Sequence, residues 1–206
     1  MNMWESGNNV GNKEGLDNML YEANYKITTP IFMAGEDPWR NPELRPPSFK
    51  GLLRFWFRAT ALPILNDWKE VKKLEATIFG STDHRSSFIL DVEVKNMSVA
   101  LEEKVENSAG LVYLGHGLTK DEQKQKQKQK QKHKHKRNNV NERKWRPHIK
   151  PGGILTVRLL VDKRSDPEAV RTFIPLTLQA LGLFGGAGAR SRRGFGSLSL
   201  LSLSVD

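Results

Sequence analysis

The sequence predicts an α+β protein of the ferredoxin-like (RRM-like) class, in which one antiparallel sheet carries two helices on one face. Segments with alternating apolar and polar residues indicate strands, and segments with apolar residues every three or four positions indicate helices. These segments follow one another in the order βαββαβ, with a hairpin and charged insertions between them. This order is the basis of the predicted class.

The first half of the chain supplies one strand and the first helical region. Apolar and polar residues alternate from Tyr25 to Ile31, which predicts a strand. Ser48 is expected to cap a helix that ends near Pro63. The apolar stripe of this helix consists of Phe49, Leu52, Leu53 and Trp56. A shorter helical stretch is predicted for residues 68–76.

The second half supplies the remaining strands and the second helix. Alternation predicts strands at residues 87–94 and 154–161, and a glycine-containing turn predicts a hairpin at residues 111–118. Pro167 and Glu168 mark a helix start behind a cap at Ser165, and Gly182 together with the glycine-rich residues 185–196 is expected to end this helix.

The last predicted strand, residues 198–205, contains a break in its alternation. Leu198 and Leu200 share one phase, whereas Leu201 begins the other. An extra residue in one strand of a pair produces this change of phase, so the sequence predicts a β-bulge between Leu200 and Leu201.

The composition favours a soluble protein with a polyanionic partner. The 206 residues carry 33 Lys and Arg against 23 Asp and Glu, and this formal charge of +10 suggests nucleic acid or an anionic membrane surface. The absence of Cys excludes a disulfide framework and a Cys-rich zinc site, and it agrees with a cytoplasmic location. We find no apolar signal region, no membrane-spanning run and no pattern that implies a cofactor or a metal.

Most of the positive charge lies in one low-complexity tract. Residues 120–137 hold eight Lys and one Arg against two acids, which accounts for seven of the ten net charges. The tract has no apolar residues to bury, so a disordered Lys/Gln-rich insertion is expected at about 120–140. It either adds sequence-independent affinity for a polyanion or is an expansion without specific function. Residues 1–20 are expected to form a flexible leader, and residues 21–206 a single domain.

A glycine-rich segment near the C-terminus is the strongest functional feature of the sequence. Five Gly and three Arg lie within residues 185–196. Glycine lets backbone amides approach a ligand closely, and arginine presents a planar set of donors to phosphate. We expect the amides together with Arg190, Arg192 and Arg193 to bind the phosphates of a nucleic acid. The alternative is a mobile basic loop between a helix and an edge strand.

The predicted helix after Ser48 has a cationic face beside its apolar stripe. Lys50, Arg54 and Arg58 recur every four residues and therefore share one side of the helix. A helix N-terminus at Ser48 would itself favour an anion. The alternative is a solvated face in which Arg54 pairs with Glu43. The tryptophan of the apolar stripe is expected in the core, with base stacking as its alternative.

These segments resemble the RAMP superfamily of CRISPR-associated proteins. The resemblance rests on three motifs in order, namely LRPPSFKGLLRFWFR at residues 44–58, IFGST at residues 78–82 and the glycine-rich segment. Within the superfamily, RPPSFKG and RFWFR are most similar to subunit one of the Cmr complex, the type III-B effector. The resemblance runs from about Tyr25 to the C-terminus, apart from the lysine-rich tract.

The resemblance implies a non-catalytic, structural RNA-binding subunit of a ribonucleoprotein that uses a CRISPR RNA to recognise foreign transcripts in antiviral defence. Its partners would be CRISPR RNA, target RNA or both, together with the other Cmr subunits, and no membrane. Family members are often longer, with two ferredoxin-like halves, and this chain matches one half. The predicted RNA-binding residues are Arg45, Ser48, Lys50, Arg54, Arg58, Gly185, Gly186, Gly188, Arg190, Arg192, Arg193 and Gly194.

Two other functions stay open from the sequence. A CRISPR RNA-processing endoribonuclease of the same fold would need a general base and acid, and His116, between two glycines, is one candidate. In some relatives a loop acid supports metal-dependent cleavage, and Asp37 lies in such a loop, although an acid beside proline is also a common turn residue. The third function is a basic nucleic-acid module outside CRISPR defence.

Overall fold

The computed structural model describes residues 19–101, 103–105, 108–121, 143–162 and 167–206. Nearly all of the predicted leader and of the lysine-rich insertion lies outside these ranges. Within them, the chain combines an antiparallel main sheet with helices, so the predicted α+β class is confirmed.

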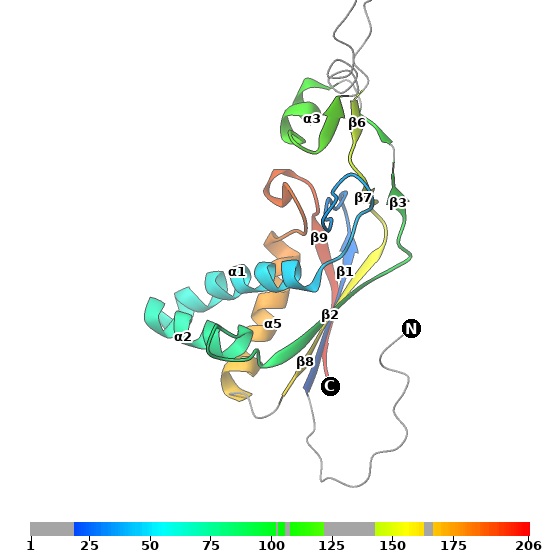
Figure 1. Ribbon diagram of the computed structural model, residues 1–206. Coiled ribbons are helices and arrows are strands. Elements are labelled where there is room, and N and C mark those ends of the chain that lie inside the picture. The colour runs from blue at the N-terminus through cyan, green and yellow to red at the C-terminus, as the bar shows by residue number, and fades with distance from the viewer. Residues whose placement is uncertain (1–18, 102, 106–107, 122–142, 163–166) are drawn as a thin grey trace, which may run out of the picture.

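The main sheet has four strands in the order β2-β8-β1-β9 (Figure 1). The strands are β1 (Met19–Ile27), β2 (Phe88–Lys95), β8 (Ile154–Val161) and β9 (Leu198–Val205). The central strands β1 and β8 pair with each other, and every pairing in the sheet is antiparallel. Strand β1 begins at Met19, earlier than the predicted Tyr25, and it ends at Ile27 instead of Ile31.

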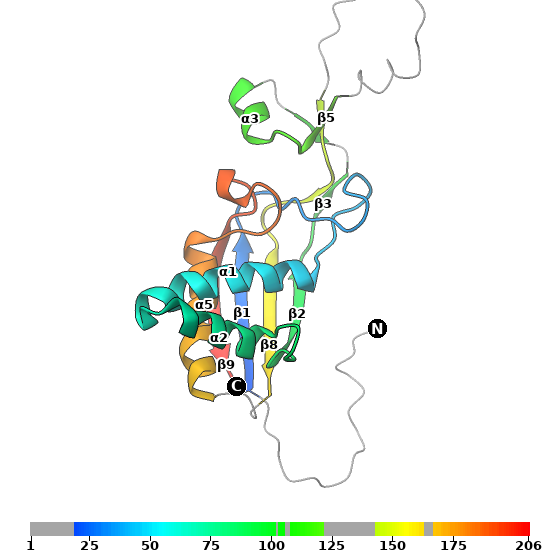
Figure 2. The same ribbon diagram turned by 60° about the vertical axis from the view of Figure 1, so that its left-hand side comes forward.

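Three helices cover one face of the main sheet (Figure 2). They are α1 (Pro46–Leu65), α2 (Trp68–Phe79) and α5 (Pro167–Phe184). Alternate strand residues face them and form the core with the apolar stripes of the helices; its largest buried side chains include Tyr21, Tyr25, Phe49, Phe57, Phe79 and Leu155. None of the helices in the described ranges combines the length and the apolar character that crossing a bilayer requires.

Helix α1 begins two residues before its predicted start. The first turn of a helix has backbone amides without intrahelical acceptors, so Pro46 and the proline after it fit there. Arg45 is the N-cap and makes no side-chain cap bond, so the predicted cap at Ser48 is wrong. The helix also continues past Pro63, and it ends where Asn66 takes a left-handed conformation with φ 50°.

Helix α5 continues through Gly182, so an end at this residue is wrong, but the helix does end at Phe184, directly before the glycine-rich segment, as predicted. A Cβ atom on Gly182 would lie 2.7 Å from the Cβ of Leu200 and 3.0 Å from the ring of Tyr25. Glycine here lets the helix approach the sheet closely, and it does not terminate the helix. The predicted cap, Ser165, lies outside the described residues.

The bulge predicted for the last strand is confirmed. Asn24 pairs with Ser202, but the next residue, Tyr25, pairs with Leu200. Leu201 is therefore the extra residue on β9, and its side chain is exposed.

A smaller unit lies beyond one end of the main sheet, between β2 and β8 in the chain (Figure 1). It contains helix α3 and two small sheets, β3-β7 and β4-β6-β5. Their bounds are β3 (Val99–Ala100), β4 (Glu103–Lys104), α3 (Ala109–Leu114), β5 (Thr119–Asp121), β6 (Arg143–Trp145) and β7 (His148–Ile149). A second core of Phe32, Leu118, Trp145 and Phe195 joins this unit to the loops of the main body.

The predicted hairpin at residues 111–118 is wrong, because α3 occupies the first half of that segment. The hydroxyl of Ser108 accepts a hydrogen bond from the Leu111 amide, which caps the start of the helix. The helix ends before Gly115, whose amide donates back to the Leu111 carbonyl. Glycines that suggested a hairpin turn thus mark the end of a short helix.

Candidate nucleic-acid interface

The glycine-rich segment is a built loop that is anchored through its backbone. The Ala187 amide donates to the Gly196 carbonyl at 2.8 Å and closes the loop on itself. The amides of Ala189 and Gly196 donate to the carbonyls of Phe32 and Pro30, each at 2.8 Å. A short 3₁₀ helix, η1 (Ser191–Arg193), forms the tip. These bonds hold the arginines of the loop on a fixed frame.

Close packing explains three of the four glycines that were expected to contact RNA. A Cβ on Gly185 would meet the Leu181 carbonyl and the Trp56 indole, and one on Gly186 would lie 2.8 Å from the Gly196 carbonyl. Gly188 has φ +87° and lies against the backbone of Phe32. Gly194 also has φ +87° but faces open space. Contact of these residues with RNA stays a prediction.

Arg190 connects the loop to the smaller unit. Its guanidinium donates twice to the carbonyl of His116, from Nε at 3.0 Å and from Nη2 at 2.6 Å. Arg190 also has a left-handed backbone, with φ 62°. Arg190 therefore already has a partner within the chain. To contact a phosphate as predicted, it would have to use its remaining N–H donors or give up its bonds to the His116 carbonyl.

Arg192 and Arg193 are the exposed cations of the loop. The guanidinium carbon of Arg192 lies 5.4 Å from the ring centroid of Phe55 on α1, which is a cation–π contact. The ring of Phe55 meets that of Trp56 edge-on at 5.2 Å. Neither residues 46–65 nor residues 184–196 contain an acid, so the charged side chains that α1 and the loop contribute to their shared surface are all positive.

Two members of the predicted cationic stripe of α1, Arg54 and Arg58, lie against α2. Arg54 donates to the carbonyls of Phe79 and Gly80 at the end of α2, where helix carbonyls lack partners. Its other terminal nitrogen lies 3.4 Å from Glu75, and Nε of Arg58 lies 3.7 Å from the same carboxylate. Arg54 and Arg58 therefore interact with carbonyl and carboxylate groups of the same chain.

The pairing of Arg54 with Glu43, given above as an alternative, is wrong, because Glu75 is its partner. Glu43 instead lies 3.9 Å from Arg45, in an exposed pair. Lys50 lies 5.5 Å from the ring centroid of Phe88, and burial, with a smaller effect of the Arg54 charge, lowers its pKa. Ser48 is exposed in the first turn of α1.

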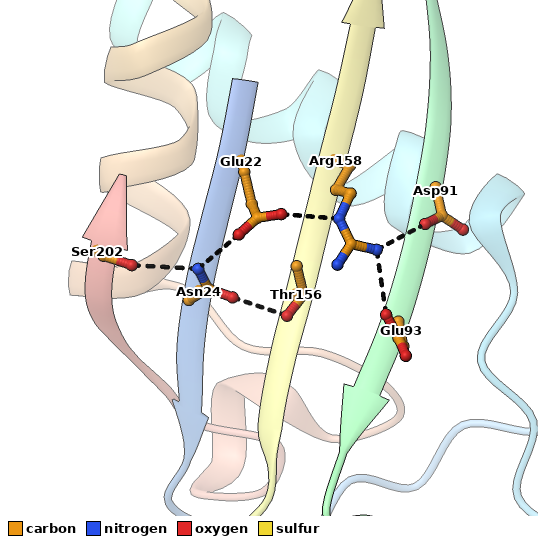
Figure 3. A network of polar contacts seen from close by, with 7 residues as sticks. All are labelled: Glu22, Asn24, Asp91, Glu93, Thr156, Arg158 and Ser202. Carbon is orange, nitrogen blue, oxygen red and sulfur yellow. Dashed lines mark hydrogen bonds and ion pairs between the residues drawn. The ribbon is translucent and has the colours of Figure 1, made fainter. Parts of the chain in front are cut away.

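The outer face of the main sheet, opposite the helices, carries a polar network (Figure 3). Arg158 donates to Glu22 at 2.8 Å and to Asp91 and Glu93 at 3.1 Å each. These bonds raise the pKa of Arg158, and its bond to Glu22 is the main cause that lowers the pKa of that carboxyl. Here Arg158 is satisfied by acids of the same chain.

The central strands lack the stacking surface of an RNA-recognition motif. RNA-recognition motifs stack bases on aromatic residues of the open sheet face. The outward positions of β1 and β8 carry no aromatic residue and include Glu22, Asn24, Thr156 and Arg158 (Figure 3). Thr156 donates to Asn24 at 2.7 Å, and Asn24 donates to Ser202 at 3.1 Å. The RRM-like order of elements is thus not accompanied by RRM-type site residues.

The candidate catalytic residues have ordinary local settings. Asp37 accepts a hydrogen bond from the Trp39 amide at 2.8 Å, which is a turn contact. His116 is exposed, and its carbonyl is the atom that Arg190 binds. In the part of the chain that the structure describes, no group of His, Cys, Asp and Glu could hold a metal ion.

Sequence reasoning missed two aromatic residues at this interface. Phe55 follows Arg54 and lies off the apolar stripe of α1, and Phe184 is the last residue of α5. The ring centroid of Phe184 lies 6.3 Å from that of Trp56. The position of Phe55 off the buried stripe of α1 was the available signal, whereas Phe184 follows the buried Leu181 by three residues and continues the apolar spacing of α5.

The sequence and the fold match those of a known class of proteins. The profile of the RAMP superfamily matches residues 24–199, and the chain belongs to this superfamily. Within it the similarity is to Cmr1, as the motifs predicted. The Cmr subunit Cmr1-1 of Pyrococcus furiosus is 30% identical over 166 residues, which are 80% of this chain and 43% of that protein.

Solved structures agree with this assignment. The crystal structure of Cmr1 from Pyrococcus furiosus in its apo form matches with a TM-score of 0.57 and 25% identity over 90% of this chain and 50% of that one. A chain of the type III-B Cmr-beta complex bound to cognate target RNA matches in fold, with a TM-score of 0.56 and 16% identity over 92% of this chain and 55% of that one. The chain spans about half the length of these relatives.

Proposed function

We propose that this chain is a non-catalytic, RNA-binding structural subunit of a type III-B CRISPR effector, the Cmr complex. Its similarity to Cmr1 supports the membership, and its likeness in fold to a chain of a complex with bound target RNA agrees with it. In this role it contacts CRISPR RNA, target RNA or both, and the neighbouring Cmr subunits. Its contribution to antiviral defence is to hold RNA for guide-directed recognition.

We further propose that the main body is a ferredoxin-like domain. The strand order β2-β8-β1-β9, with helices α1 and α2 after the first strand and α5 after the third, supports this description. The helices lie on one face of the sheet (Figure 2). Fold alone does not identify the ligand, so the RNA-binding role depends on the loop.

One observation carries the RNA-binding proposal. The anchored glycine-rich loop places Arg192 over Phe55 of α1 and leaves Arg193 exposed, in two segments that contain no acid. Cations beside aromatic rings bind single-stranded RNA by phosphate contact and stacking, without reading a fixed sequence. A subunit that must accept many guide sequences needs this kind of contact.

The test is RNA binding by the purified chain across a salt series. The double variant Arg192→Ala/Arg193→Ala is expected to lose about tenfold or more in affinity for single-stranded RNA at low salt. The slope of log affinity against log salt concentration should become less steep by about 1.4. Each phosphate contact on a single strand contributes about 0.7 to this slope, and the variant loses two contacts. Fluorescence anisotropy with labelled oligonucleotides measures both quantities.

A matched variant removes the same charge elsewhere. Lys72 and Lys73 are exposed on α2, and Lys72→Ala/Lys73→Ala lowers the net charge equally. This control should retain nearly all of the affinity. Equal losses in the two double variants would show a general charge effect and contradict a site at the loop.

The endoribonuclease alternative has one observation in its favour. Because Arg190 binds the carbonyl of His116, this histidine lies beside the arginine-rich loop. If the wild-type chain cleaves a repeat RNA and His116→Ala binds this RNA with equal affinity but does not cleave it, the chain is an endoribonuclease and not a non-catalytic subunit. We expect intact RNA from the wild-type chain, with and without divalent metal.

A further inference from the structure

Two phenylalanine rings are exposed where helices α1 and α5 meet the glycine-rich loop. The side chain of Phe184 is 76% exposed and that of Phe55 is 44% exposed. The ring of Trp56 lies between them in the contact network, with centroids 5.2 Å from Phe55 and 6.3 Å from Phe184. Three aromatic rings from two helices thus form a continuous surface, and its outer two members are open to solvent.

The charges around these rings favour one class of ligand. Residues 46–65 and 184–196 together contain one Lys and five Arg and no acid. Arg192 lies over Phe55, so a cation and a ring are already placed together. A polyanion with flat apolar faces complements this surface, and single-stranded RNA offers both phosphates and bases. An acidic protein would match the charge but would leave the flat rings without equivalent partners.

We propose that Phe184 and Phe55 stack bases of single-stranded RNA while Arg192 and Arg193 contact its phosphates. This inference rests on the proposed RNA-binding function and adds to it the part of the RNA that each side chain contacts. Trp56, which is partly buried against the core, contacts both rings. Since every base has a π-face, such stacking is independent of sequence.

The experiment separates stacking from apolar contact and from charge. Phe184→Leu and Phe55→Leu keep an apolar side chain and remove the ring, and each is expected to weaken binding of single-stranded RNA about tenfold. The salt dependence should remain that of the wild type, because no phosphate contact is lost. The matched control is Trp68→Leu, since Trp68 is 53% exposed on α2 near acids of that helix.

A second variant and a second ligand complete the test. Leu183 is 70% exposed beside Phe184, and Leu183→Ser should leave RNA affinity unchanged if the rings act by stacking. An oligonucleotide of abasic residues keeps the phosphates and lacks the bases. Its binding should be weak to the wild-type chain and equally weak to the two Phe→Leu variants. Melting temperatures should change little, because neither ring belongs to the buried core.

Each outcome decides the proposal. Wild-type affinity in both Phe→Leu variants would overturn stacking and leave the proposed function intact. If these variants also failed to assemble with the other Cmr subunits, the rings would form a protein-docking surface instead. A large loss in Leu183→Ser would also overturn it. A wild-type chain that binds no RNA would overturn the proposed function and this inference together.

Discussion

The two faces of the main sheet use arginine in opposite ways. On the outer face, Arg158 is surrounded by Glu22, Asp91 and Glu93 of neighbouring strands (Figure 3). On the helical side, Arg192 lies over an aromatic ring in a surface made from two segments without acids. A cation that carboxylates enclose stabilises the fold, whereas a cation beside a ring is available to an external anion. We therefore expect the neighbours of an arginine, and not the net charge of the chain, to determine where a polyanion would bind.

The stripe of α1 is intermediate between these two cases. Arg54 and Arg58 share Glu75, yet both side chains are partly exposed. Arg54 also binds carbonyls at the end of α2, so its first role is to join two helices. An RNA contact of this stripe stays a prediction, and it would be weaker per residue than one at the loop.

The largest effect that tests the comparison is on stability. Arg158→Leu should lower the free energy of unfolding by about 1–3 kcal/mol, because three carboxylates lose a common donor and repel one another. RNA affinity should not change. Arg192→Leu should show the reverse, with unchanged stability and weaker RNA binding. Urea denaturation and anisotropy on both variants measure the two effects, and similar profiles for the two variants would contradict the distinction.

A smaller effect concerns the dependence of stability on pH. The hydrogen bonds from Arg158 and Asn24 lower the pKa of Glu22 below its ordinary 4.5. The folded state thus favours the charged carboxylate, so Glu22 contributes stability above pH 4.5 that is lost as the pH falls through its lowered pKa. Wild-type stability should decline in this acid range more steeply than that of Glu22→Gln. Parallel curves from denaturation at pH 3 to 6 would count against the network.

The smallest effect concerns the surface of α1. A Cβ on Gly51 would meet no atom within 4 Å, so Gly51→Ala should raise the free energy of unfolding by about 0.5–1 kcal/mol. Gly182→Ala is the contrasting variant, since its methyl would collide with Leu200 and destabilise the protein. If RNA lies against α1, Gly51→Ala should also weaken RNA binding. A stabilised variant with unchanged affinity would place the RNA away from this part of the helix.

Local patterns predicted most of the fold because their periods are short. The alternation within residues 154–161 is enough to predict a strand, and the apolar spacing that begins at Phe49 is enough to predict a helix. The break in phase at Leu201 correctly predicted a bulge. The failures also have local causes. Gly115 looks the same in a hairpin turn and at a helix end, and Gly182 resembles a helix terminator although it serves a close contact.

Tertiary partners could not be predicted in this way. Arg54 lies 21 residues from Glu75, and Arg190 lies 74 residues from His116, so neither pair leaves a periodic signal. The glycine-rich motif marks a segment that the structure shows as a loop anchored through its backbone, and its contact with RNA stays a prediction. It did not reveal that one of its three arginines binds within the chain, or that Phe55 lies beneath another.

The hydrogen bonds that join Leu20 to Asp206 have a practical consequence. Each of these residues donates its amide to the carbonyl of the other, so β1 begins where β9 ends. The glycine-rich loop lies at the opposite end of β9 (Figure 1). A label or surface tether attached after Asp206 would therefore leave the loop accessible, and the chain could be immobilised through this end for every RNA titration described above.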